Sequence, residues 1–144
     1  MKIEKFTLEH YEELVDMYYE FTKEVYPDRK IGFKYSFYLA ISEWINKKHD
    51  IVLAMNNDTV CGFSMCYVDE VDGLTEPMYR AEIAYVKPKY RRGRAAYMLY
   101  NNAYKYSKDI DMKIITLSRI SNGTDKMVED KFNLTKTYTM YEGV

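Results

Sequence analysis

A basic segment of the chain reads Val86-Lys87-Pro88-Lys89-Tyr90-Arg91-Arg92-Gly93-Arg94-Ala95-Ala96. The residues before it, from Met78 to Val86, are rich in types that favour a strand, and Pro88 ends this strand because proline cannot donate to a ladder. The residues after it repeat apolar positions with helical spacing to about Tyr106. We therefore predict a strand, a tight turn and a helix that begins within or just after residues 91–96.

The predicted helix start is suited to binding a phosphate group. The first four N–H groups of a helix have no intrahelical partner, and they attract anions. Gly93 and the two alanines let a phosphate approach the backbone, while Arg91, Arg92 and Arg94 supply charge and forked donors. The alternative is an exposed basic patch, either solvated or bound to nucleic acid. The position between a strand and a helix favours a pyrophosphate site over that alternative.

Length and composition indicate a globular chain. With 144 residues, 47% hydrophobic and 30% charged, we expect one domain over residues 1–144. The longest apolar runs are far shorter than the roughly 20 residues that cross a bilayer, and the first residues lack the apolar core of a secretion signal. We therefore expect a cytoplasmic protein with no membrane partner. The net charge of −1 gives no general basic field, which makes nucleic acid an unfavoured partner.

The two cysteines and two histidines predict neither a disulfide nor a metal site. Cys61 and Cys66 lie in one predicted strand, where an odd separation places side chains on opposite faces, so they cannot bridge each other. Neither is near a histidine in the sequence or at a helix start, which favours buried packing over a covalent mechanism. No spacing matches a metal-ligand pattern, and we expect no metal cofactor.

Apolar periodicity and turn residues predict an α/β domain. We predict strands at residues 2–6, 51–55, 59–68, 78–86, 113–117 and 135–141, and further helices at 8–25, 33–47 and 123–132. Thr7 is the expected cap of the first helix. The resulting order, βααββ-β-α-β-α-β, indicates a mixed central sheet with helices on both faces.

The basic segment resembles the acetyl-CoA motif of the GNAT N-acetyltransferases, V-x-P-x-Y-(Q/R)-x-x-G-x-(G/A). Arg91 stands at the first key position of this motif and Ala96 at its last. Arg94 stands where the motif normally has glycine, and Gly93 lies one position earlier. The resemblance therefore implies the overall placement of a cofactor site, with altered phosphate contacts.

The resemblance covers nearly the whole chain. Residues 52–54, with Gly62 and Phe63, are similar to the central hairpin of the family. Asn122 stands twelve residues before Leu134. The family has the same spacing between an asparagine and the phenylalanine of its closing Gly-Phe pair, which Asn133-Leu134 replaces here. A GNAT-like fold is thus expected.

This family implies acetyl-CoA as the acyl-donor cosubstrate. Its pyrophosphate would lie against the turn and the helix start, and its pantetheine arm would pair with the open edge of the preceding strand. The expected cofactor-binding residues are Ala84, Tyr85, Val86, Arg91, Arg92, Gly93, Arg94, Ala95, Ala96 and Asn122.

The family's chemistry implies direct attack of a primary amine on the thioester. Such a reaction needs a neutral nucleophile and an acid for the leaving thiolate. Glu82, just before the expected pantetheine segment, is the candidate base. The alternative is that Glu82 faces solvent or pairs with Arg80 or Lys87.

A second group must supply the proton for the leaving thiolate. Glu129 stands where many family members carry a tyrosine general acid, so that role is not carried over. Tyr138 on the last predicted strand and Ser118 at the end of the preceding one are the candidates instead. A phenol with a pKa of about 10 is roughly matched to a thiol leaving group.

The sequence is compatible with several acceptors and with more than one activity. An acidic loop either attracts a cationic amine or is only a soluble loop, and its members are Asp69, Glu70, Asp72 and Glu76. Small-molecule amines, protein lysines and protein N-termini all stay open. A second reading is a catalytically inactive GNAT-fold interaction module that still binds CoA, and a nucleic-acid binder is a distant third. Dimers are common in the family, so a homodimer is one expected form.

Overall fold

The computed structural model describes residues 1–70, 76–116, 124–132 and 134. The strands are β1 (Lys2–Lys5), β2 (Asp50–Asn56), β3 (Thr59–Asp69), β4 (Met78–Val86) and β5 (Lys113–Thr116). The helices are α1 (Tyr11–Val25), α2 (Lys34–Asn46), α3 (Ala95–Asp109) and α4 (Thr124–Phe132), with short 3-10 turns at η1 (Leu8–His10) and η2 (Pro88–Tyr90). The predicted order is confirmed from β1 to α4. The last predicted strand, at residues 135–141, lies outside the described residues.

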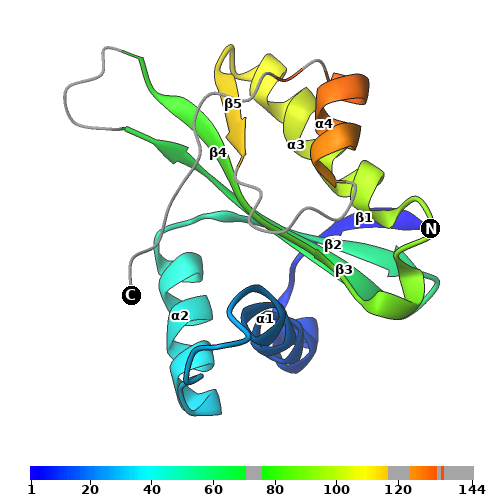
Figure 1. The fold of residues 1–144 in the computed structure, drawn as a ribbon. Helices are drawn as coiled ribbons and strands as arrows, with labels where there is room; N and C mark the ends of the chain where they lie inside the picture. The colour runs from blue at the N-terminus through cyan, green and yellow to red at the C-terminus, as the bar shows by residue number, and fades with distance from the viewer. Residues whose placement is uncertain (71–75, 117–123, 133, 135–144) are drawn as a thin grey trace.

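The five strands form one mixed sheet in the order β1-β2-β3-β4-β5 (Figure 1). The first four strands pair antiparallel, and β5 pairs parallel with the first part of β4. That parallel pairing runs from Met78 opposite Lys113 to Ala81 opposite Thr116. The predicted mixed α/β sheet is therefore confirmed.

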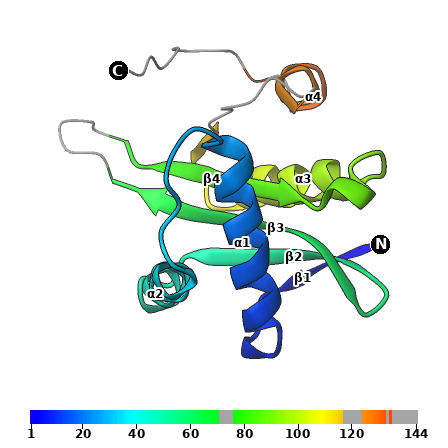
Figure 2. The same ribbon diagram turned by 60° about the horizontal axis from the view of Figure 1, so that its bottom comes forward.

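Helices cover both faces of this sheet (Figures 1 and 2). On one face, Leu14 and Val15 of α1 and Ile41 of α2 pack with Phe63 of the sheet. On the other face, Leu99 of α3 packs in a second buried cluster, and α4 joins α3 through aromatic contacts. No helix among the described residues is long and apolar enough to span a bilayer.

Two β-bulges change which side chains share a face. In β3, Cys61 is the extra residue between the pairs Ala54↔Gly62 and Met55↔Val60. Because a bulge shifts the alternation of side chains by one, Cys61 and Cys66 both pack in clusters with α3. The prediction that the two cysteines face opposite sides of the sheet is therefore wrong, although both are unbridged.

The second bulge lies in β4 at Glu82. Met65 pairs with Ile83 and Cys66 with Ala81, which leaves Glu82 without a partner on β3. As a result, Ala81 packs on the α3 face, whereas Ile83 packs on the face that α1 and α2 cover. The bulge thus reverses the alternation along β4 in the middle of the strand.

The end of β4 is held close to β3 at Gly62. A Cβ atom at this position would lie 2.6 Å from the carbonyl oxygen of Tyr85 and 3.2 Å from the Cα of Val86. Only a residue without a side chain permits this approach. Gly62 therefore fixes the backbone that leads into the basic segment.

The start of the first helix differs from the prediction. The Thr7 side chain makes no capping hydrogen bond, and the Thr7 carbonyl instead accepts from the backbone N–H of His10 at 3.0 Å. The chain first forms the 3-10 turn η1, and α1 begins at Tyr11. The predicted side-chain cap is wrong because this tighter first turn uses the backbone carbonyl.

Candidate active site

Among the described residues, the second half of β4 has no strand partner on the side of β5. Pairing with β5 ends at Ala81, whose carbonyl also accepts a hydrogen bond from Thr116 Oγ1 at 3.2 Å. Within the described part of the chain, Ile83 to Val86 pair only with β3, and Glu82 pairs with neither neighbouring strand. The bulge at Glu82 directly follows the last described pair of β4 with β5, and bulges commonly end pairing. This open edge carries backbone N–H and C=O groups that can accept an added strand-like ligand.

The turn after β4 leads directly into α3. Its backbone bonds are local, with the N–H of Tyr90 donating to Lys87 at 2.9 Å and that of Gly93 to Tyr90 at 3.2 Å. Arg94 is the cap residue, and the N–H of Met98 makes the first helical bond, to Arg94 at 2.9 Å. The N–H groups of the first helical turn before Met98 thus have no helical acceptor.

Small residues surround these donors. Ala95 is fully buried beneath the start of α3, and Ala96 is half-buried. A Cβ atom on Gly93 would find its nearest heavy atom at 3.5 Å, so the turn is not crowded. Ala84, on the open edge of β4, packs beside the aromatic contacts of α3 and α4. The geometry leaves a backbone surface that a ligand can approach.

The three arginines of the segment have different surroundings. Arg92 and Arg94 are exposed and make no side-chain hydrogen bond or ion pair with the described residues. Arg91 instead donates through Nη1 and Nη2 to the two carboxylate oxygens of Glu24, at 2.6 and 2.5 Å, and through Nε to the carbonyl of Val86 at 2.8 Å. The hydrogen bond that Arg91 donates to Glu24 is the main cause that raises the pKa of Arg91. Among the described residues, the donors of Arg92 and Arg94 are thus available to a ligand, whereas Arg91 is already paired.

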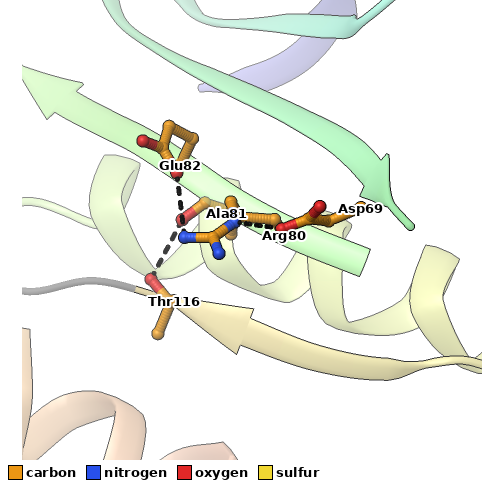
Figure 3. A network of polar contacts seen from close by, with 5 residues as sticks. All are labelled: Asp69, Arg80, Ala81, Glu82 and Thr116. Atoms are coloured by element: carbon orange, nitrogen blue, oxygen red, sulfur yellow. Dashed lines mark hydrogen bonds and ion pairs between the residues drawn. The ribbon is translucent and has the colours of Figure 1, made fainter. Parts of the chain in front are cut away.

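Glu82 belongs to a small ionic network on β3 and β4 (Figure 3). Arg80 donates through Nε to Asp69 at 2.9 Å and through Nη1 to Glu82 at the longer distance of 3.4 Å. The side chain of Glu82 is 29% exposed, so water and a ligand can reach it. Pairing with Arg80, one of the predicted alternatives, is present, and it leaves a second carboxylate oxygen of Glu82 available.

The negative charge of Glu82 affects the pKa of two nearby tyrosines. Burial raises the pKa of Tyr18, and the nearby Tyr26 and Glu82 add to the rise. Burial also raises the pKa of Tyr67, again with a contribution from Glu82. Both phenols therefore stay protonated beside the carboxylate and can serve as hydrogen-bond donors.

Other predicted site residues lie elsewhere. Ser118, Asn122, Tyr138 and Asp72 are outside the described residues. Glu129 is exposed on α4. Within the acidic loop, Glu70 is exposed, and Glu76 lies 3.8 Å from Lys113. Three residues near the site were not predicted from the sequence: Glu24, Tyr18 and Tyr67. They come from α1 and β3, and no sequence motif includes them.

The cysteines are unsuited to covalent chemistry. Cys66 is buried, and burial raises its pKa to about 12 from 9.0. Burial also raises the pKa of Cys61. Among the described residues, no three histidine, cysteine or carboxylate side chains form a group that could hold a metal ion.

We expect alkylation of Cys66 by iodoacetamide at pH 7 to be at least about a thousandfold slower in the native protein than in the unfolded chain. The reason is the pKa of about 12, which lowers the reactive thiolate fraction by that factor. Mass spectrometry of time points in buffer and in urea measures both rates. Rapid labelling of native Cys66 would contradict its burial.

Comparisons with known proteins agree on one fold. A model of the acetyltransferase (GNAT) family matches residues 9–127. A structure described as a probable acetyltransferase is similar, with 19% identity, a TM-score of 0.78 and coverage of 100% of this chain and 99% of that one. Aminoglycoside antibiotic 6'-N-acetyltransferase AAC(6')-Ig from Acinetobacter haemolyticus, solved without ligand, gives 15% identity, a TM-score of 0.73 and coverage of 100% and 97%.

A third structure was solved with a ligand. It is AAC(6')-Iy in complex with the bisubstrate analogue CoA-S-monomethyl-acetylneamine, with 17% identity, a TM-score of 0.72 and coverage of 99% of this chain and 96% of that one. A search of curated protein sequences finds no match. At these identities the structural likenesses establish the fold alone.

Proposed function

The chain belongs to the acetyltransferase (GNAT) family, and on that premise we propose that it is an N-acetyltransferase that moves the acetyl group of acetyl-CoA directly to a primary amine. We propose that residues 1–144 form one such domain. The observation that carries the proposal is the open edge of β4 from Glu82 to Val86, which ends at a turn and a helix start with unpaired N–H groups.

Backbone hydrogen bonds and positive charge would bind the acyl donor, acetyl-CoA. The amide-bearing pantetheine arm would pair with the edge of β4 near Ala84, Tyr85 and Val86, because both partners offer N–H and C=O groups. The pyrophosphate would lie at the start of α3, where helix N–H groups, together with Arg92 and Arg94, which have no partner among the described residues, attract negative charge. The AAC(6')-Iy structures in complex with CoA and with a CoA-containing analogue support this choice of donor.

Glu82 is the proposed base. A protonated amine must lose a proton before its nitrogen lone pair can attack. The Glu82 carboxylate, 29% exposed and beside the open edge, would take that proton directly or through water. The nitrogen then forms a bond to the thioester carbon, the C–S bond breaks, and the proton that leaves the nitrogen passes to the sulfur or to water. Ser118 and Tyr138 remain the predicted acids for the thiolate.

The acceptor is proposed to be a cationic amine. Asp69 and Glu82 together carry two negative charges against the single positive charge of Arg80, so the network favours a cation. Protonated Tyr18 and Tyr67 add hydrogen-bonding groups on the same face of the sheet. Both small-molecule amines and protein amines satisfy this description.

An inactive module is the second candidate. Arg94 stands in place of the motif's glycine, and Glu129 in place of the family's tyrosine. A chain with these changes could keep the fold and the CoA site without turnover. Such a module would bind acetyl-CoA and release no thiol.

Two measurements test the proposal. We expect acetyl-CoA to bind the purified protein with a micromolar dissociation constant in calorimetry. We also expect a panel of primary amines to stimulate release of free thiol from acetyl-CoA, detected with a thiol reagent. Binding without amine-dependent release would select the inactive module, and absence of binding would overturn both candidates.

A further inference from the structure

We propose that Glu24 is a positioning residue for acetyl-CoA, which it serves by holding Arg91 and thereby the turn that precedes α3. This inference rests on the proposed function. It also assigns Arg91 a structural task in place of direct phosphate binding. Glu24 lies 67 positions before Arg91 in the chain, and only the fold brings the two together.

The contact between Glu24 and Arg91 is a bidentate ion pair. Two guanidinium nitrogens donate to the two oxygens of one carboxylate, at 2.6 and 2.5 Å. The third donor, Nε, binds the carbonyl of Val86 at the end of β4. The same guanidinium lies 5.5 Å from the ring centre of Tyr85, whose edge contacts Phe21 one turn before Glu24. Arg91 therefore ties the last turn of α1 to the end of β4.

The turn has few other anchors. The last backbone bond that joins it to the neighbouring strand is from Lys87 N–H to Cys61 at 2.8 Å. The bonds that follow are local, and that from Arg91 N–H to Pro88 is long at 3.3 Å. Between Tyr90, which packs on the core, and buried Ala95, Arg91 is the one side chain with a polar partner among the described residues. Its ion pair thus decides where the N–H groups of the turn lie.

Glu24 is not placed where it would help its own helix. It is the residue before the last in α1, which ends at Val25. A carboxylate in the last turn of a helix is opposed by the partial negative charge of the helix C-terminus. The pair with Arg91, and not the stability of α1, is therefore the interaction that a carboxylate at this position serves.

The pair also makes Arg91 a poor phosphate ligand. Three of its five N–H groups are engaged, by Glu24 and by the Val86 carbonyl. Its positive charge is already paired with the Glu24 carboxylate, so a phosphate would have to compete with Glu24 for it. Arg92 and Arg94 make no such bonds with the described residues, so they are the side chains available to the cofactor.

The test is a double-mutant cycle on acetyl-CoA affinity. We expect Glu24→Ala and Arg91→Ala each to raise the dissociation constant of acetyl-CoA about fivefold, the size expected for a half-exposed charged pair. The double variant should be no weaker than either single variant, because the two side chains act as one unit. The loss should appear chiefly in the KM of acetyl-CoA, whereas a general loss of folded enzyme would lower kcat instead.

Two further variants separate positioning from general effects. Glu20→Ala removes a carboxylate one turn earlier in α1, where Lys23 is the partner, and should bind acetyl-CoA like the wild type. Glu24→Gln keeps the shape and one acceptor oxygen, so its dissociation constant should lie between those of the wild type and Glu24→Ala. The salt dependence of binding should stay unchanged in Glu24→Ala and become weaker in Arg94→Ala, which loses a phosphate contact.

The outcomes distinguish this inference from the proposed function. Wild-type affinity in Glu24→Ala would overturn the positioning role while leaving acetyl-CoA binding intact. Tighter binding in Glu24→Ala would also overturn it, since a freed Arg91 would then be a phosphate ligand. Absence of binding by the wild type would overturn the proposed function itself. If Arg91→Ala fails to fold, Glu24→Gln and Glu24→Ala still decide the question.

Discussion

We expect Glu82→Gln to lower kcat for amine acetylation by about a hundredfold or more. The carboxylate is the proposed base, and general bases contribute about a hundredfold to ten-thousandfold. Glutamine has nearly the same size and can still accept from Arg80, so the fold and the acetyl-CoA affinity should be preserved. Steady-state thiol release at saturating acetyl-CoA and pH 7.5 measures the change.

The dependence on pH identifies the reason for this loss. The deficit of Glu82→Gln should shrink as pH rises toward the pKa of the amine, because a larger fraction of the acceptor is then neutral without a base. Glu9→Gln removes an exposed carboxylate of η1, to which no role in the site is assigned, and should keep wild-type kcat. If Glu82→Gln stays within about threefold of the wild type over the whole pH range, Glu82 is not the base.

The strand, turn and helix around residues 86–96 could be predicted because their signals are local. The bounds of β4, Met78–Val86, follow from β-favouring residues and a proline stop, and α3 begins at Ala95, within the predicted range. Helices α1 and α2 likewise follow from apolar residues at helical spacing. Each of these signals lies within the element that it specifies.

The details of the site could not be predicted because they depend on pairing between distant segments. The bulges at Cys61 and Glu82 arise from register with neighbouring strands, and no local pattern marks them. They decide that both cysteines face α3 and that Glu82 directly follows the last described pair of β4 with β5. The pairing of Arg91 with Glu24 depends in the same way on where the end of α1 lies over the sheet.

Reversing the charge of the exposed Arg92 and Arg94 should weaken acetyl-CoA binding strongly. We expect Arg92→Glu/Arg94→Glu to raise the dissociation constant of acetyl-CoA by about a hundredfold or more. Each replacement turns an attraction to the phosphates into a repulsion, and a hundredfold loss corresponds to about 2.7 kcal/mol for the pair. Calorimetry at low and moderate salt measures the change, with kcat at saturating acetyl-CoA as the second readout.

The salt dependence of this variant separates local repulsion from a change in total charge. Binding by the wild type should weaken as salt is added, whereas binding by Arg92→Glu/Arg94→Glu should strengthen, because salt screens attraction in one and repulsion in the other. Lys105→Glu/Lys113→Glu makes the same change in net charge at exposed positions away from the start of α3 and should bind within about threefold of the wild type. Equal losses in the two double variants would mean that acetyl-CoA responds to the total charge of the protein. The start of α3 would then no longer be distinguished as its phosphate site.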